Sequence, residues 1–230
     1  MFDPLLRPVK DRALAPLARA AGDLHPHLVT AASLASGIAA AAAAWAGAWG
    51  VGLILWIACR ILDGLDGLIA REQGSVSDLG GFFDLVSDFI VYAAIPLAIA
   101  LRPGAPDSLL AWTAILLGTF YVNTAAWMVP AALLERRRAR ESGSPTSIEI
   151  PEGLVSGGET VLFYLLFFLI PSQQLLLVQT MAVLTAITVV QRILWAVRAF
   201  GPSVETTPDP GTPRPTSPSS PSPDRPSPDR

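Results

Sequence analysis

The chain has 230 residues, of which 51% are hydrophobic and only 15% charged, and its formal net charge is −3. Soluble domains carry nearer a quarter of charged residues, so this composition excludes an ordinary soluble domain and indicates a membrane protein. The net charge is small and its sign says nothing about partners, so the placement of the charges must be considered instead. We expect membrane lipid and no nucleic acid as partners.

The N-terminal segment, residues 1–26, is predicted to lie on the cytoplasmic side of the membrane. Its stretch 5–22 mixes apolar and basic positions and contains Pro8 and Pro16, so any helix there is short. We interpret this segment as lying on the lipid headgroups. The alternative is a loose tail.

Six apolar spans follow in the predicted membrane domain, residues 27–201. Glycine, proline and polar residues separate them, and a bilayer span needs about 20 apolar residues. The spans cover residues 27–46, 51–70, 79–101, 108–133, 154–170 and 174–197. The predicted fold class is therefore all-α, a polytopic membrane protein with six transmembrane helices.

Basic residues indicate how these spans are oriented. They are concentrated before the first span and in the fourth connection, at Arg7, Lys10, Arg12, Arg19, Arg136, Arg137, Arg138 and Arg140. The positive-inside rule places the N-terminus and the loops 71–78 and 135–152 in the cytoplasm. An even number of spans puts the C-terminus there too. We expect a multi-pass protein of the inner membrane with a disordered, Pro/Ser-rich tail at residues 202–230.

Four aspartates lie inside or beside the second and third spans. Asp63 and Asp66 are three residues apart and Asp84 and Asp88 four apart, so each pair shares one helix face. The two spans are predicted to be antiparallel neighbours joined by loop 71–78. At about 1.5 Å per residue, the two pairs reach matching depths.

These carboxylates are costly within a membrane. An ionised aspartate at a helix centre costs about 3 kcal/mol even on the lenient insertion scale. Only Arg60 and Arg71 are near in sequence and cannot neutralise all four. Hard divalent cations bind oxygen ligands, and two of them roughly 4 Å apart can clamp a phosphate. The pattern therefore predicts a site for two divalent cations, Mg²⁺ or Mn²⁺.

Two alternatives remain at this point: aspartates facing water in a vestibule, and the relay of an ion or proton transporter. A transporter should offer a polar path through the outer half of the bilayer, where the second and third spans are almost wholly apolar. Gly67 and Gly80 favour a ligand-binding site instead, because they lie next to the carboxylate faces and leave room for a flat or bulky group.

The segment reads Asp63-x2-Asp66-Gly67-x2-Ala70-Arg71-x8-Gly80-x3-Asp84-x3-Asp88. This pattern is similar at every fixed position to the signature of the CDP-alcohol phosphotransferase (CDP-alcohol phosphatidyltransferase) family. The six-span topology with a cytoplasmic site also agrees with that family. The resemblance disfavours a catalytically silent member, because every signature aspartate is present.

The resemblance implies that an alcohol hydroxyl attacks the phosphorus of a CDP-linked lipid, giving a phosphodiester and CMP. Asp63, Asp66 and Asp84 would hold the metals, and Asp88 would be the catalytic base and also touch a metal. The CDP-lipid would be bound by Gly67, Arg71 and Gly80. The substrates are then CDP-diacylglycerol and a small alcohol, and a homodimer stays open.

The sequence identifies the acceptor alcohol less closely than it identifies the reaction. Glycerophosphate-using members show Asp-Pro-x-x-Asp-Lys at the second aspartate pair, and this chain has neither that proline nor that lysine. Serine and inositol phosphate stay open. The residues expected to bind the acceptor are Arg60, Glu159 and Arg192, although Glu159 also suits a helix start and Arg192 an anchoring role.

The stretch His25-Pro26-His27-x2-Thr30 resembles the Pro-Asn-x-x-Thr stretch that precedes the first span in this family, with His27 in place of the asparagine. Hard cations prefer oxygen ligands. We therefore interpret His25 and His27 as interfacial residues and not as metal ligands.

Overall fold

The computed structural model describes residues 12, 14–18, 20, 24–140 and 157–201, and this part of the chain contains helices and no strand. One helix lies on each predicted span. They are α2 (Pro26–Trp45), α3 (Trp49–Glu72), α4 (Asp78–Ala100), α5 (Asp107–Arg140), α6 (Gly157–Leu169) and α7 (Gln174–Phe200), with a 3-10 turn, η1 (Pro171–Gln173), before α7. The tail predicted to be disordered, 202–230, lies outside the described residues.

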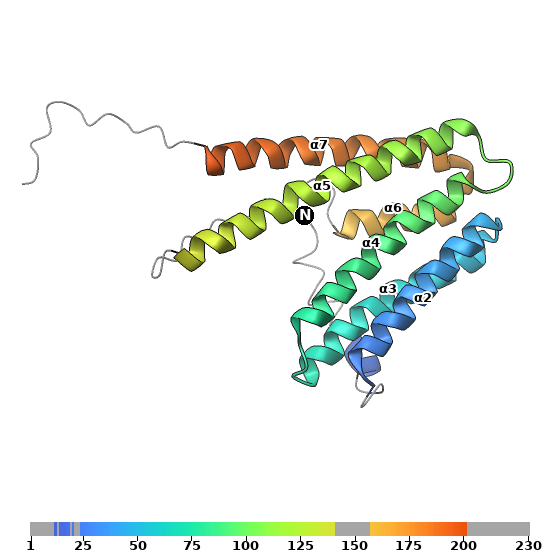
Figure 1. The fold of residues 1–230 in the computed structure, drawn as a ribbon. Helices are drawn as coiled ribbons and strands as arrows, with labels where there is room; N and C mark the ends of the chain where they lie inside the picture. Colours follow the sequence, from blue (N-terminus) through green and yellow to red (C-terminus); the bar gives the residue numbers. More distant parts are fainter. Residues whose placement is uncertain (1–11, 13, 19, 21–23, 141–156, 202–230) are drawn as a thin grey trace, which may run out of the picture.

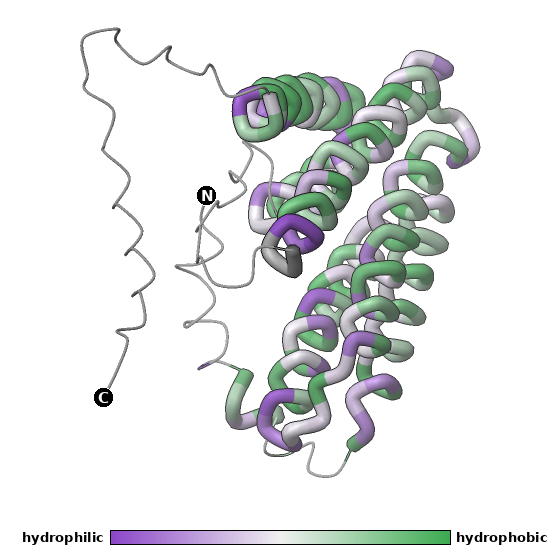
Figure 2. Tube along the Cα trace, turned by 60° about the vertical axis from the view of Figure 1, so that its left-hand side comes forward, coloured by the Kyte–Doolittle hydropathy of each residue, from purple (hydrophilic) through white to green (hydrophobic). Residues whose placement is uncertain are grey.

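The helices have the character of membrane spans. Four of them, α2, α4, α5 and α7, are long and apolar enough to cross a membrane. Most of each helix is apolar, and hydrophilic residues gather near the helix ends, including the end where α3 meets α4 (Figure 2). The chain is thus an all-α polytopic membrane protein. α6 is a shorter apolar helix, and α3 carries the charged residues of the aspartate motif.

The start of α2, the α3–α4 connection and the ends of α5 and α7 all lie on the same side of the bundle (Figure 1). One boundary differs from the prediction. The basic residues from Arg136 onward were expected in a loop, but α5 continues to Arg140. The helix therefore extends beyond its apolar part and carries these residues on its last turns.

Helix α2 packs closely on α3 because its facing side chains are small. Its sequence is rich in alanine, serine and glycine, which let two helix backbones approach each other. The hydroxyl of Ser33 donates a hydrogen bond of 2.9 Å to the carbonyl of Cys59, and Ser36 donates one of 2.8 Å to the carbonyl of Leu55. These bonds fix α3 against α2.

Helix α2 also packs along α4, so it lies against both aspartate helices. The helices α3 and α4 are joined by a short connection, but they make almost no close backbone contact with each other, whereas α2 lies against both. Gly37 marks the place where the three meet: a Cβ atom there would lie 2.5 Å from Val91 of α4 and 3.1 Å from Cys59 of α3. The two aspartate helices therefore meet through their side chains, as Arg60 does with Asp88, and share α2 as their common backbone support.

The N-terminal segment contains a helical stretch at residues 14–18. Leu14 and Ala18 are buried, in a cluster with Leu65, Leu68 and Ile69 of α3. Apolar side chains of the N-terminal segment thus pack on the protein itself, beside the half of α3 that carries Asp66. Residues 1–11, 13, 19 and 21–23 of this segment lie outside the described residues.

Candidate active site

The four aspartates lie near one another on α3 and α4, and Asp84 shares a side-chain hydrogen bond with Asp63. Asp84 of α4 lies within electrostatic range of the carboxylates of Asp63, Asp66 and Asp88. The backbones of α3 and α4 make few close contacts, and their side chains meet across the interface, as Arg60 and Asp88 do. The structure therefore brings together the residues that the helical spacing paired.

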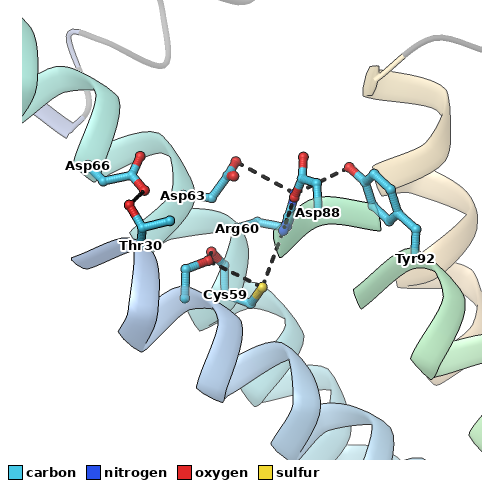
Figure 3. A network of polar contacts seen from close by, with 8 residues as sticks. Thr30, Cys59, Arg60, Asp63, Asp66, Asp88 and Tyr92 are labelled. Carbon is cyan, nitrogen blue, oxygen red and sulfur yellow. Dashed lines mark hydrogen bonds and ion pairs between the residues drawn. The ribbon is translucent and has the colours of Figure 1, made fainter. Parts of the chain in front are cut away.

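Asp63 and Asp88 share a cation. Arg60 Nη2 donates a hydrogen bond of 2.8 Å to Asp88 Oδ1, and Arg60 Nη1 lies 3.6 Å from Asp63 Oδ2 (Figure 3). The guanidinium also donates to the hydroxyl of Tyr92 at 3.2 Å and lies over the ring of Trp56, 4.7 Å from its centroid. Arg60 is thus fixed on an aromatic support and connects α3 to α4.

Asp66 has a different partner. Its Oδ2 atom accepts a hydrogen bond of 2.6 Å from the hydroxyl of Thr30 on α2 (Figure 3). Both residues are buried, with Asp66 only 5% exposed. A hydrogen bond to a charged group in such surroundings is short and strong. Thr30 therefore fixes the orientation of this carboxylate.

A pocket of about 470 Å³ lies where α2 begins and where α3 meets α4. Its wall combines carboxylates, one arginine, small residues and two imidazoles. The lining residues are His25, Pro26, His27, Thr30, Asp66, Gly67, Ala70, Arg71, Ser75, Val76, Ser77, Gly80, Gly81 and Asp84. The three residues that the motif assigns to the CDP-lipid are all present.

The glycines of this wall differ in what surrounds them. A Cβ atom at Gly67 would meet only Arg71 Nη1, at 3.5 Å, which is ordinary contact. A Cβ atom at Gly80 would lie 3.2 Å from the hydroxyl oxygen of Ser77 and 3.4 Å from the ring of His27, and at Gly81 it would meet nothing within 4 Å. The absence of side chains at these positions keeps the pocket open.

The chemistry of the aspartates fits hard cations, because carboxylate oxygens from two facing helices are the ligands that such cations prefer. Within the described residues, no group of three or more His, Cys, Asp or Glu side chains lies close enough to enclose an ion in this conformation. The carboxylate oxygens thus suit a divalent cation. In the present conformation, Asp88 and Asp63 interact with Arg60, and Asp66 accepts a hydrogen bond from Thr30.

The acceptor-binding candidates lie in different surroundings. Arg60 contacts Asp88 directly. Arg192 of α7 is buried and donates a hydrogen bond of 2.9 Å to the side-chain oxygen of Asn123 on α5, so it connects these two helices. Glu159 lies in the first turn of α6 and is half-buried. Neither Glu159 nor Arg192 lines the pocket.

Sequence reasoning missed several residues of the site. Thr30 belongs to a recognised stretch but was given no role, and Tyr92 and Trp56 carried no signal apart from being aromatic. His25 and His27 were expected at the interface, and the structure places both in the pocket wall. One signal could have indicated a role for Thr30: it follows His27 by one helix turn, in a stretch that resembles a family motif.

The family model described as CDP-alcohol phosphatidyltransferase matches residues 23–194. The chain belongs to the CDP-alcohol phosphatidyltransferase family. The matched range includes every aspartate and glycine of the motif. Members of this family are transferases, which agrees with the pocket and does not support the transporter alternative.

Two curated relatives are similar to this member of the family. It is 33% identical over 121 residues to Inner membrane protein YnjF of Escherichia coli (strain K12), covering 52% of this chain and 57% of that protein. It is 32% identical over 142 residues to Archaetidylinositol phosphate synthase of Pyrococcus horikoshii, covering 62% of this chain and 66% of that one. The matches thus span somewhat less than two thirds of these relatives.

Solved structures share the fold. The Mycobacterium tuberculosis phosphatidylinositol phosphate synthase (PgsA1) with CDP-DAG bound has a TM-score of 0.62 at 23% identity, covering 81% of this chain and 94% of that chain. The same enzyme in complex with manganese and citrate has a TM-score of 0.61 at 23% identity, covering 78% and 86%. At this sequence identity, the likeness shows that the folds are similar and carries no conclusion about activity.

Proposed function

We propose that the protein is a metal-dependent phosphatidyltransferase of the inner membrane, which transfers a phosphatidyl group from CDP-diacylglycerol to a small alcohol and releases CMP. The observation that carries this proposal is that Gly67, Arg71 and Gly80 line the same pocket as Asp66 and Asp84. Relatives named as an inner membrane protein and as an enzyme with CDP-DAG bound support the location and the donor.

Asp63, Asp66, Asp84 and Asp88 are the residues that would hold two divalent cations, Mg²⁺ or Mn²⁺. Bound cations of this kind neutralise the charge that builds up on the phosphate oxygens during transfer. A solved relative in complex with manganese supports this choice of ion. Arg71 contributes a further positive charge for the diphosphate, and Gly67 and Gly80 leave room for the nucleotide.

In the transfer, the acceptor oxygen forms a bond to phosphorus while the bond from phosphorus to the CMP oxygen breaks. Asp88 receives the proton of the acceptor hydroxyl, because its carboxylate is held by Arg60 and lies near Asp84, which lines the pocket. Of the three acceptor-binding candidates, Arg60 has the strongest support because it contacts Asp88. An acceptor with an anionic group could pair with this guanidinium.

The site and both termini are proposed to face the cytoplasm. Two observations support this orientation: the basic residues lie near the start of α2 and the end of α5, and these ends lie on the same side as the α3–α4 connection (Figure 1). The positive-inside rule assigns that side to the cytoplasm.

The test is an assay of CMP release by purified protein given CDP-diacylglycerol, Mg²⁺ or Mn²⁺, and separately serine, inositol phosphate and glycerol phosphate. Asp66→Asn should weaken both cation and CDP-lipid binding. Asp88→Asn keeps the shape and loses the basicity, so turnover should fall roughly 10²–10⁴-fold while CDP-lipid binding largely survives. An active Asp88→Asn variant would contradict the assigned base, and no CMP release with any acceptor would contradict the function.

A further inference from the structure

His27 presents an imidazole ring to the pocket from the first turn of α2. The residue is half-buried and lines the pocket. Its ring lies 4.8 Å from the ring of His25, tilted by 39°, and 6.1 Å from the ring of Phe83 in an edge-to-face arrangement. The rings of His25 and His27 line the pocket and are called the aromatic wall here, and Phe83, which is not among the lining residues, packs against His27.

The surface beside this wall is bare backbone. Gly80 approaches His27 so closely that an added Cβ atom would lie 3.4 Å from Cε1 of the imidazole, and the neighbouring Gly81 has open space. A planar group can therefore lie on the ring of His27 without meeting a side chain at these two positions. Aromatic faces opposite small residues suit flat heteroaromatic ligands.

The polar atoms of the two histidines are used differently. Nδ1 of His25 accepts a hydrogen bond of 3.3 Å from the backbone N–H of His27, so this ring caps the start of α2. In the described part of the chain, the ring nitrogens of His27 take part in no hydrogen bond. The imidazole of His27 thus offers the pocket both a face and unused hydrogen-bonding atoms.

We propose that His27 packs against the nucleobase of the CDP-lipid and is the residue that makes the pocket select cytosine. This inference rests on the proposed function. The diphosphate is assigned to the other part of the pocket, where Arg71 and the carboxylates of Asp66 and Asp84 lie. The base is the uncharged, planar part of the nucleotide, and the aromatic wall is the part of the pocket that matches it.

The experiment measures CMP and UMP binding to the purified protein by calorimetry with Mn²⁺ present, for wild type, His27→Ala, His27→Phe and His27→Asn. His27→Ala should weaken CMP binding roughly five- to a hundred-fold, which corresponds to the loss of one stacked ring. His27→Phe should keep most of the CMP affinity but prefer CMP over UMP less strongly, because it retains a ring and lacks the nitrogens. His27→Asn should lose the stacking as alanine does.

The matched control is Leu28→Ala, at the next residue of α2, whose side chain is 63% exposed and does not line the pocket. It should bind CMP as wild type does. Inorganic pyrophosphate binding is measured in parallel, and a melting curve for each variant verifies that it is folded.

Two results would overturn the inference. The first is an unchanged CMP affinity in His27→Ala. The second is an equal loss of CMP and pyrophosphate affinity in both the alanine and the phenylalanine variant, because this would assign His27 to the phosphates. The proposed function fails in a different way. In that case the wild-type protein itself would bind no CMP and release none from CDP-diacylglycerol.

Discussion

Arg60 Nη2 lies 2.8 Å from Asp88 Oδ1, so the carboxylate proposed as the base is held by a guanidinium on the opposite helix. Both side chains are mostly removed from solvent, with exposed fractions of 13% for Arg60 and 25% for Asp88. Removing one partner of a pair in such surroundings leaves an uncompensated charge. The pair therefore connects the stability of the helix arrangement to the position of the base.

Replacing Arg60 is expected to lower both the stability of the protein and its transferase activity. Arg60→Gln should lower the melting temperature and reduce CMP release, because Asp88 and Asp63 lose their shared cation. Arg60→Lys keeps the charge but loses the planar fork that serves two carboxylates, so its activity should lie between wild type and Arg60→Gln. Melting curves and initial rates check this, and full activity in Arg60→Gln would show that Asp88 needs no such partner.

Thr30 is expected to act through Asp66. Thr30→Val removes the 2.6 Å hydrogen bond with little change in shape, and loss of such an orienting partner typically costs roughly 10–100-fold in metal affinity or activity. The Mn²⁺ concentration needed for half-maximal CMP release should rise accordingly. Thr30→Ser keeps the hydroxyl and should restore most of the affinity. A valine variant with unchanged Mn²⁺ dependence would contradict this role.

Gly37 is expected to set the distance between helices. In Gly37→Ala the new methyl group would lie 2.5 Å from a methyl group of Val91, so α4 must shift, at a cost of about 1–3 kcal/mol in unfolding free energy. Asp88 lies one turn before Val91, and activity should fall with stability. The double variant Gly37→Ala, Val91→Ala removes the overlap and should recover both. If it does not, the contact is not the cause.

The orientation in the membrane can be tested with a fusion. A reporter that becomes active only in the periplasm should stay inactive when joined after Arg198, near the end of α7. The same reporter placed at Gly104, in the turn between α4 and α5, should be active. This turn lies on the opposite side of the bundle from the end of α7 (Figure 1). The reverse pattern would place the pocket outside the cytoplasm.

The spacing of residues predicted the helices and the pairing of aspartates well, since both follow from apolar runs and from helix periodicity. The family resemblance implied Gly67, Arg71 and Gly80 as one group, and the pocket contains all three. The sequence did not predict that α2 supports both α3 and α4, or that Thr30 bonds to Asp66. Those contacts join residues far apart in the chain, and no local pattern encodes the packing of small side chains that brings them together.

The charges of α3 bear on how the protein enters the bilayer during synthesis. α3 is absent from the helices that are apolar enough to span by composition, so it should insert poorly alone. Arg60 and Asp63 pair within α3 itself at 3.6 Å, and the partner of Asp66 lies on α2, which leaves the ribosome first. We expect α2 and α3 to leave the translocation channel together as a hairpin, with the future active site partly neutralised before α4 is made.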